Sequence, residues 1–141
     1  MNEFFSDSDI IASYTRTDAM TGGEQINLSE KYPDECSLYK FPVFCTNKIW
    51  GLIQSAVENT EHCNDFKGVI WDVLYMSIHA PGRKSILGGT GTEFTVIITG
   101  GNVTPDFYEG GQPIYRLHSI CGPMDIDNPV PAITIMFPDE D

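Results

Sequence analysis

Asp72 and His79 are the two side chains whose types and spacing come nearest to catalytic or ligand-binding chemistry. They lie seven residues apart in a segment whose pattern predicts a helix, so both fall on nearly the same face. A carboxylate in this position could orient a histidine as an acid–base partner or bind a polar ligand. With Tyr14, Arg16 and Arg83 they would line a pocket for a small ligand or nucleotide between helix and sheet. A solvated helix face is the simpler interpretation of the same two residues.

Other groups of reactive residues lack the partners that their chemistry needs. The glycine-rich segment Gly88–Thr92 is followed by a glutamate and a strand-like run, not by a lysine and a helix, so it is not a phosphate-binding loop. His62 and Cys63 are adjacent, and no cysteine has the closely spaced second ligand that structural zinc sites use. Strand alternation would point His118 and Cys121 to opposite faces. We therefore expect no metal, no cofactor and no catalytic residue set, which makes an enzyme the less favoured interpretation.

The charge of the chain is strongly negative. It carries 20 Asp and Glu against 8 Lys and Arg, a formal net charge of −12 over 141 residues. Such a surface repels nucleic acid and anionic lipid, and it favours a protein partner with a basic surface. Solubility is the simplest purpose of this charge. The carboxylates could also imitate the phosphates of a nucleic acid, and the candidates for partner binding are Glu58, Glu61, Asp65, Asp125, Asp127, Asp139, Glu140 and Asp141.

The sequence also predicts a compartment. No stretch is long and apolar enough to span a bilayer, and the start of the chain, Met1–Asp7, lacks the features of a signal peptide. We therefore expect a cytoplasmic protein whose cysteines stay as thiols. Cys45 and Cys121 lie in apolar runs and are predicted to be buried.

The elements that must position these residues are predicted by periodicity. Apolar residues at helical spacing predict two helices, and alternating apolar residues predict strands. The expected fold is α+β, with two helices packed on one face of a small antiparallel sheet that ends in a C-terminal β-hairpin. Residues 1–141 form one domain, of which about 1–12 are loosely held. The predicted elements are a strand at Gln25–Leu28, a loop at Lys31–Lys40, helices at Thr46–Asn59 and Phe66–Ile78, strands at Phe94–Thr99, Ile114–Cys121 and Val130–Phe137, and a turn at Gly122–Pro129.

Several segments resemble a known protein family. They are Tyr14–Ala19, Phe41–Thr46 with Trp50 shortly after, Trp71–Met76 and the ending Ala132–Asp141, in this order along most of the chain. The chain is similar there to an uncharacterised family of small bacterial proteins carried on plasmids, phages and integrative elements. The resemblance implies no activity and no catalytic residues. It implies a setting, the accessory genes of mobile elements, where inhibitors of host defence are common.

Charge and resemblance together predict a non-catalytic binding protein. The expected target is a host nucleic-acid-binding defence system, which the acidic surface would inhibit in the manner of an anti-restriction or anti-CRISPR protein. The first alternative is a protein that sequesters a small ligand or nucleotide. The second alternative is an enzyme of unknown reaction that uses Asp72 and His79.

Overall fold

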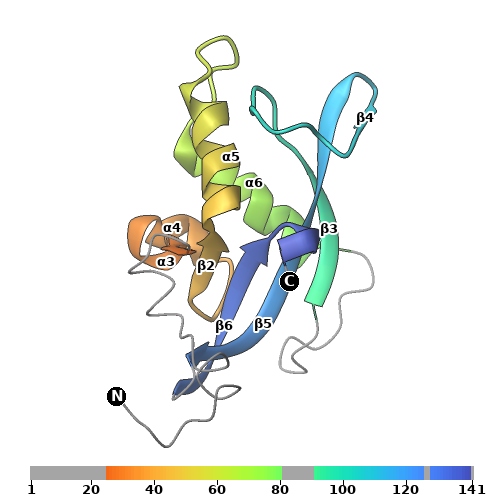
Figure 1. Cartoon of the computed structure of the whole chain (residues 1–141). Helices are drawn as coiled ribbons and strands as arrows, with labels where there is room; N and C mark the ends of the chain where they lie inside the picture. Colours follow the sequence, from red (N-terminus) through yellow and green to blue (C-terminus); the bar gives the residue numbers. More distant parts are fainter. Residues whose placement is uncertain (1–24, 81–90, 126–127, 141) are drawn as a thin grey trace, which may run out of the picture.

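The structure is a computed structural model, and it describes residues 25–80, 91–125 and 128–140. Within these ranges the chain is α+β, and Figure 1 gives the arrangement and the labels used below. The elements follow one another as β1 (Gln25–Asn27), α3 (Leu28–Lys31), α4 (Pro33–Cys36), β2 (Val43–Thr46), α5 (Asn47–Glu58), α6 (Phe66–Ile78), β3 (Gly91–Ile97), β4 (Phe107–Glu109), β5 (Gln112–Asp125), β6 (Asn128–Met136) and the 3₁₀ turn η2 (Pro138–Glu140).

The six described strands form one mixed sheet. Its order is β1-β2-β6-β5-β3, and β4 pairs with the start of β5. The predicted C-terminal hairpin is confirmed by the antiparallel pair β5–β6. The prediction of a purely antiparallel sheet is wrong, because β2 runs parallel to β6 with Val43 opposite Ile133. This pairing joins segments 90 residues apart, so no local pattern in the sequence indicates it.

The two long helices begin where the sequence predicts. The Thr46 hydroxyl accepts a hydrogen bond from the Ile49 N–H at 3.4 Å and caps α5. Asp65 caps α6 by accepting from the Gly68 N–H at 3.1 Å, and α6 spans the predicted Phe66–Ile78. Each helix therefore starts at a side chain that satisfies an otherwise unpaired backbone donor.

Two local predictions are wrong. The segment predicted as a loop at Lys31–Lys40 contains α4, and α3 precedes it, because Asn27 caps α3 and Pro33 opens α4. The turn predicted at Gly122–Pro129 is shorter, since β5 continues to Asp125 and β6 starts at Asn128. Tertiary pairing overrides the turn preference of the glycine and prolines in that segment.

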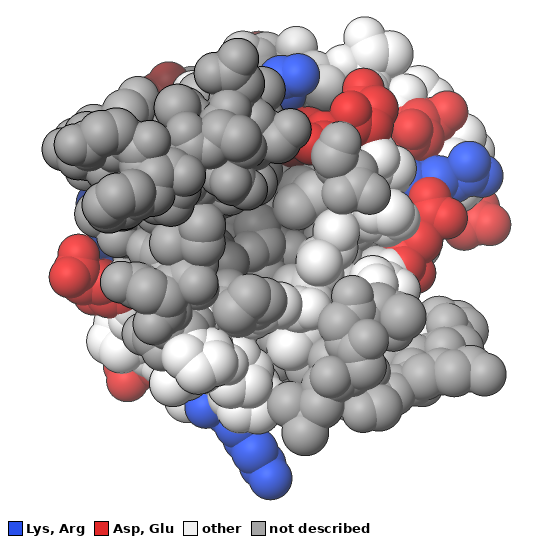
Figure 2. Space-filling view, turned by 60° about the horizontal axis from the view of Figure 1, so that its bottom comes forward, with Lys and Arg blue, Asp and Glu red and all other residues white. Residues whose placement is uncertain are grey.

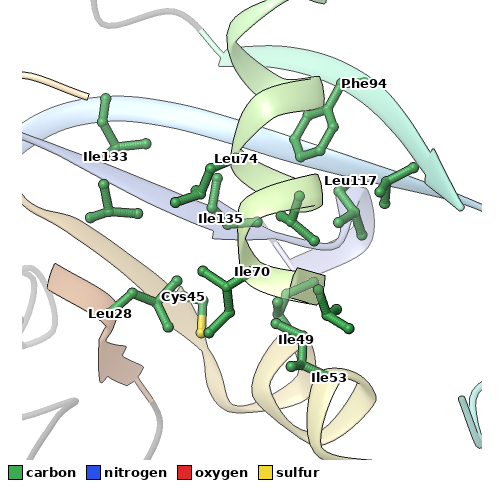
Figure 3. Packing of buried hydrophobic residues seen from close by; sticks show 14 of the residues in the cluster. Leu28, Cys45, Ile49, Ile53, Ile70, Leu74, Phe94, Leu117, Ile133 and Ile135 are labelled. Carbon is green, nitrogen blue, oxygen red and sulfur yellow. The ribbon is translucent and has the colours of Figure 1, made fainter. Parts of the chain in front are cut away.

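The core lies between the sheet and the two long helices. In Figure 3, Ile70 and Leu74 of α6 lie beside Ile133 and Ile135 of β6, and all four are fully buried. Cys45 and Cys121 are buried in the same cluster, as predicted. The phenol of Tyr39 crosses this interior and hydrogen bonds the hydroxyls of Ser77 at 2.7 Å and Ser119 at 3.3 Å. No helix in the described ranges is both long enough and apolar enough to cross a membrane.

The segment between β3 and β4 is fastened to α5 and to the turn that follows it. Asn64 donates its side-chain N–H to the Thr99 carbonyl at 2.8 Å, and the Asn102 N–H donates to the Ser55 hydroxyl at 3.0 Å. Gly101 lies so close to Leu52 that an added Cβ would come within 2.5 Å of the leucine Cδ1. These contacts hold the β3–β4 segment against α5 and the turn that follows it.

Candidate functional site

A groove between α6 and the sheet contains Asp72, one of the residues that the sequence singles out. Its volume is about 330 Å³. One wall is the outer face of α6, and the other walls come from β3, β4 and β5. We call it the α6 groove, and its lining residues are Asp72, Tyr75, Met76, Thr95, Val96, Ile97, Glu109 and Ile114. It lies where α6 packs on β3, an end strand in the sheet order of the described residues.

Three rings stack along α6 beside the groove. Tyr75 lies between Trp71, with ring centroids 4.7 Å apart, and His79, with centroids 4.2 Å apart. The ring Nδ1 of His79 also lies 2.9 Å from the Tyr75 carbonyl oxygen, which holds the imidazole in place. These contacts follow from the spacing of four residues, which puts side chains above one another on a helix. Tyr75 is thus a wall of the groove whose ring is held on both faces.

The Asp72 carboxyl is partly desolvated in this position. Burial raises its pKa above the ordinary aspartate value. No hydrogen bond or ion pair joins the carboxylates of Asp72 or Glu109 to another described residue. Met76, Ile97 and Ile114 supply apolar surface between and around them. The groove therefore combines hydrocarbon walls with two carboxylates that no described residue contacts by a hydrogen bond or ion pair.

The structure places Asp72 and His79 differently from a catalytic pair. Seven residues of helix separate them by about 10 Å along the axis. His79 is engaged with Tyr75 and does not line the groove. The other residues predicted for this pocket, Tyr14, Arg16 and Arg83, lie outside the described residues.

The acidic residues predicted to bind a partner fall in three separate places. Glu58, Glu61 and Asp65 lie around the α5–α6 turn, at the top of Figure 1. Asp139 and Glu140 lie in η2, near the start of α5, which is 12 residues long and spans about 18 Å. Asp125 ends β5 at the far end of the β5–β6 hairpin, and its side chain, like Asp127 and Asp141, lies outside the described residues.

Three of these carboxylates accept hydrogen bonds, and one of them, Glu58, accepts from the Gln54 side chain at 3.2 Å. Asp65 is the N-cap of α6, and Glu140 accepts hydrogen bonds from the Thr46 hydroxyl and the Phe137 N–H, both at 2.8 Å.

Figure 2 shows one face of the molecule, where acidic side chains gather at the upper right with a basic side chain among them. The negative charge on that face is therefore interrupted.

A second, larger hollow lies between α5, the β3–β4 segment and η2. Its volume is about 570 Å³. Leu52, Val103 and Phe137 give it an apolar lining, and its charged side chains are Lys48, Asp106 and Asp139. The charged groups in this lining are therefore of both signs, unlike those of the α6 groove. Nothing in the local sequence indicates this hollow, because its walls come from three distant segments.

Metal and thiol chemistry find no support in the described residues. Within the described ranges, no three His, Cys, Asp or Glu side chains are grouped to hold a metal ion. Burial raises the pKa of Cys36 to about 11 and that of Cys45 further, so both remain protonated thiols at neutral pH. Cys63 is exposed and lies in the α5–α6 turn with a φ of 53°.

Sequence reasoning missed Glu109 and Ile97, which complete the groove. Ile97 belongs to a predicted strand, but the exposure of its side chain depends on which elements pack around that strand. The sequence contains a signal for a turn directly after Glu109, because Gly110 and Gly111 follow it. In the structure both glycines have positive φ, at 60° and 82°. A Gly-Gly pair between strand-forming residues is a hairpin signal.

Comparisons with known proteins identify a family but no activity. A model of a family of unknown function (DUF6573) matches residues 1–141. No curated protein and no solved structure matches the chain. The expected membership in an uncharacterised family is confirmed by this match, and the mobile-element setting stays a prediction.

Proposed function

The chain belongs to the family DUF6573, and we propose that it acts without catalysis, by binding a protein partner that has a basic surface. The face around α6 and β3 is the binding surface. The observation that carries this proposal is the combination, on one face, of exposed apolar side chains with carboxylates that no other described residue pairs. Trp71 is 41% exposed and Ile97 is 49% exposed, and Asp72 and Glu109 line the groove beside them.

Exposed aromatic side chains of this kind are typical of interaction surfaces. Trp, Tyr and Met are enriched at the centres of protein interfaces, where a few of them supply most of the binding free energy. Trp71, Tyr75 and Met76 are all exposed on α6, and neighbouring exposed apolar side chains are typical of interaction sites. A partner that covers them would bury apolar area and exclude water from the carboxylates.

The charge of the molecule supports a basic partner. A net charge of −12 attracts cationic proteins and repels nucleic acid, so it favours the cationic channel of a nucleic-acid-binding complex as the target. In this proposal the protein is carried on a mobile element and inhibits a host defence complex of this kind. The partner contacts the face on α6 and β3, and the carboxylates do not have to form a continuous array that imitates phosphates.

Capture from a bacterial extract tests this function. The immobilised protein is expected to retain nucleic-acid-binding proteins at about 50 mM salt and to release most of them at about 300 mM, because salt screens the attraction. Added DNA or RNA should compete for the retained proteins. With a captured protein then purified, Trp71→Ala should weaken binding at least about tenfold, as loss of a central aromatic residue does.

Leu38→Ala is the matched control. Leu38 is similarly exposed, at 37%, but it follows α4 and does not line the groove. This variant should bind as the unaltered protein does. Capture that is indifferent to both salt and nucleic acid, or equal losses in the two variants, would overturn the proposed function.

A further inference from the structure

The α6 groove has the shape and chemistry of a site for a single side chain. Its volume of about 330 Å³ is at the small end of the range for ligand pockets, about 300–1,000 Å³. Met76, Ile97 and Ile114 offer hydrocarbon contacts, and Asp72 and Glu109 offer two carboxylates from different elements. An occupant that satisfies all of these groups has an apolar stem and a cationic end.

We propose that the α6 groove binds an arginine side chain of the basic partner, with its methylene groups against Met76, Ile97 and Ile114 and its guanidinium group facing the carboxylates of Asp72 and Glu109. This inference rests on the proposed function, and it names the group that the partner contributes. Arginine fits better than lysine because the guanidinium group has five N–H donors in a plane and can contact two carboxylates at once.

The state of the Asp72 carboxyl supports this occupant. Partial burial disfavours its ionised form, and no described residue supplies a compensating cation or donor. A cation in the groove would remove that disadvantage, because an opposite charge nearby favours the ionised form. A guanidinium group in the groove would therefore lower the pKa of Asp72 toward its ordinary value.

The groove is also preorganised for binding. Tyr75 is held between Trp71 and His79, so its ring does not have to be fixed when the ligand enters. The backbone of Glu109 is held by the β4–β5 pairing, in which it lies opposite Gln112. Walls that are already ordered lose little conformational entropy on binding, which increases affinity.

Titration with N-acetyl-arginine methylamide, followed by amide chemical shifts in NMR, tests the site in the intact protein. Saturable shifts are expected at Asp72, Met76, Ile97 and Glu109, with dissociation in the millimolar range, about 1 mM or weaker, for so small a ligand. The citrulline analogue, which has the same shape without the charge, should cause no saturable shift. Asp72→Asn and Glu109→Gln should each weaken binding by about fivefold.

A variant with two charges removed elsewhere separates the site from the overall field. Glu30→Gln with Asp34→Asn removes two charges from α3 and α4, so the affinity for the arginine analogue should change by less than about twofold. Equal losses in this control, or shifts scattered outside the groove, would overturn the inference.

The same variants distinguish failure of this inference from failure of the proposed function. A basic partner that is still bound equally well by Asp72→Asn with Glu109→Gln would overturn the arginine site and leave the proposed function standing. Binding of the arginine analogue in the groove, with no salt-sensitive partner in any extract, would overturn the proposed function and leave the cation site standing.

Discussion

At the scale of single residues, the Asp72 side chain is exposed on α6, and yet partial desolvation raises the pKa of its carboxyl. An asparagine or glutamine at this position of α6 would carry no charge to desolvate. Proteins commonly retain such locally unfavourable groups where binding needs them, at the expense of stability. The residue therefore offers a test in which function and stability change in opposite directions.

Asp72→Asn is expected to stabilise the free protein at neutral pH while it weakens binding. Because the folded-state pKa of Asp72 is raised, its contribution is most unfavourable above that pKa and vanishes below the ordinary aspartate pKa of about 3.9. The gain in thermal midpoint over the unaltered protein should therefore shrink as pH falls from about 7 toward about 4. Thermal unfolding of both proteins across this range measures it.

Asp34→Asn is the control for this comparison. Asp34 is an exposed carboxylate in the first turn of α4, where the helix dipole favours negative charge. Its removal should give no stabilisation at neutral pH. A loss of stability in Asp72→Asn at pH 7 would contradict the assignment of an unfavourable charge.

At the scale of elements, the segment between β3 and β4 packs closely against α5. Gly101 has no space for a side chain, since an added Cβ would lie 2.5 Å from the Leu52 Cδ1 and 3.3 Å from the Tyr115 hydroxyl oxygen. Asn64 and Ser55 fasten the same segment by hydrogen bonds to Thr99 and Asn102. This packing fixes the segment that leads into β4, and β4 itself is held by its pairing with β5.

Gly101→Ala should destabilise the fold by about 1–3 kcal/mol, because overpacking forces the segment away from α5. Gly51→Ala is the matched control: Gly51 lies within α5, nothing lies within 4 Å of its added Cβ, and alanine favours the helix by about 1 kcal/mol. Urea unfolding measures both variants. Equal stability of the two would show that the close approach to Leu52 is not a constraint.

At the scale of the whole molecule, the net charge of −12 is a source of self-repulsion as well as of attraction to partners. The compact state brings 20 acidic side chains into one small domain, with 8 basic side chains to offset them. Screening by salt weakens this repulsion more in the folded state than in the expanded chain. The same charge therefore links stability to the salt dependence of binding.

The thermal midpoint at pH 7 should rise as sodium chloride increases from about 20 to about 300 mM, a range in which screening changes strongly. Near pH 4.4, the isoelectric point of the sequence, the increase should disappear because the net charge is close to zero. Differential scanning calorimetry at the two pH values measures this. A midpoint that falls with salt at pH 7 would mean that attractive charge pairs dominate the folded state.

Local patterns of sequence determined the two long helices and most of the strands. Thr46 and the apolar stripe after it identify α5, and α6 has the bounds that its pattern predicts. These features could be predicted because helix caps and periodicity act between residues that are near in the chain. The burial of Cys45 and Cys121 could be predicted from the apolar runs around them, and the acidic net charge follows from composition alone.

Only the tertiary structure decided the mixed sheet and the groove. The parallel pairing of β2 with β6, and the approach of Glu109 and Ile97 to Asp72, join segments far apart in sequence. Such contacts depend on how whole elements pack, and no local preference encodes them. Composition therefore supplied the sign of the charge, whereas packing placed Asp72 and Glu109, whose carboxylates no described residue pairs, beside an apolar wall.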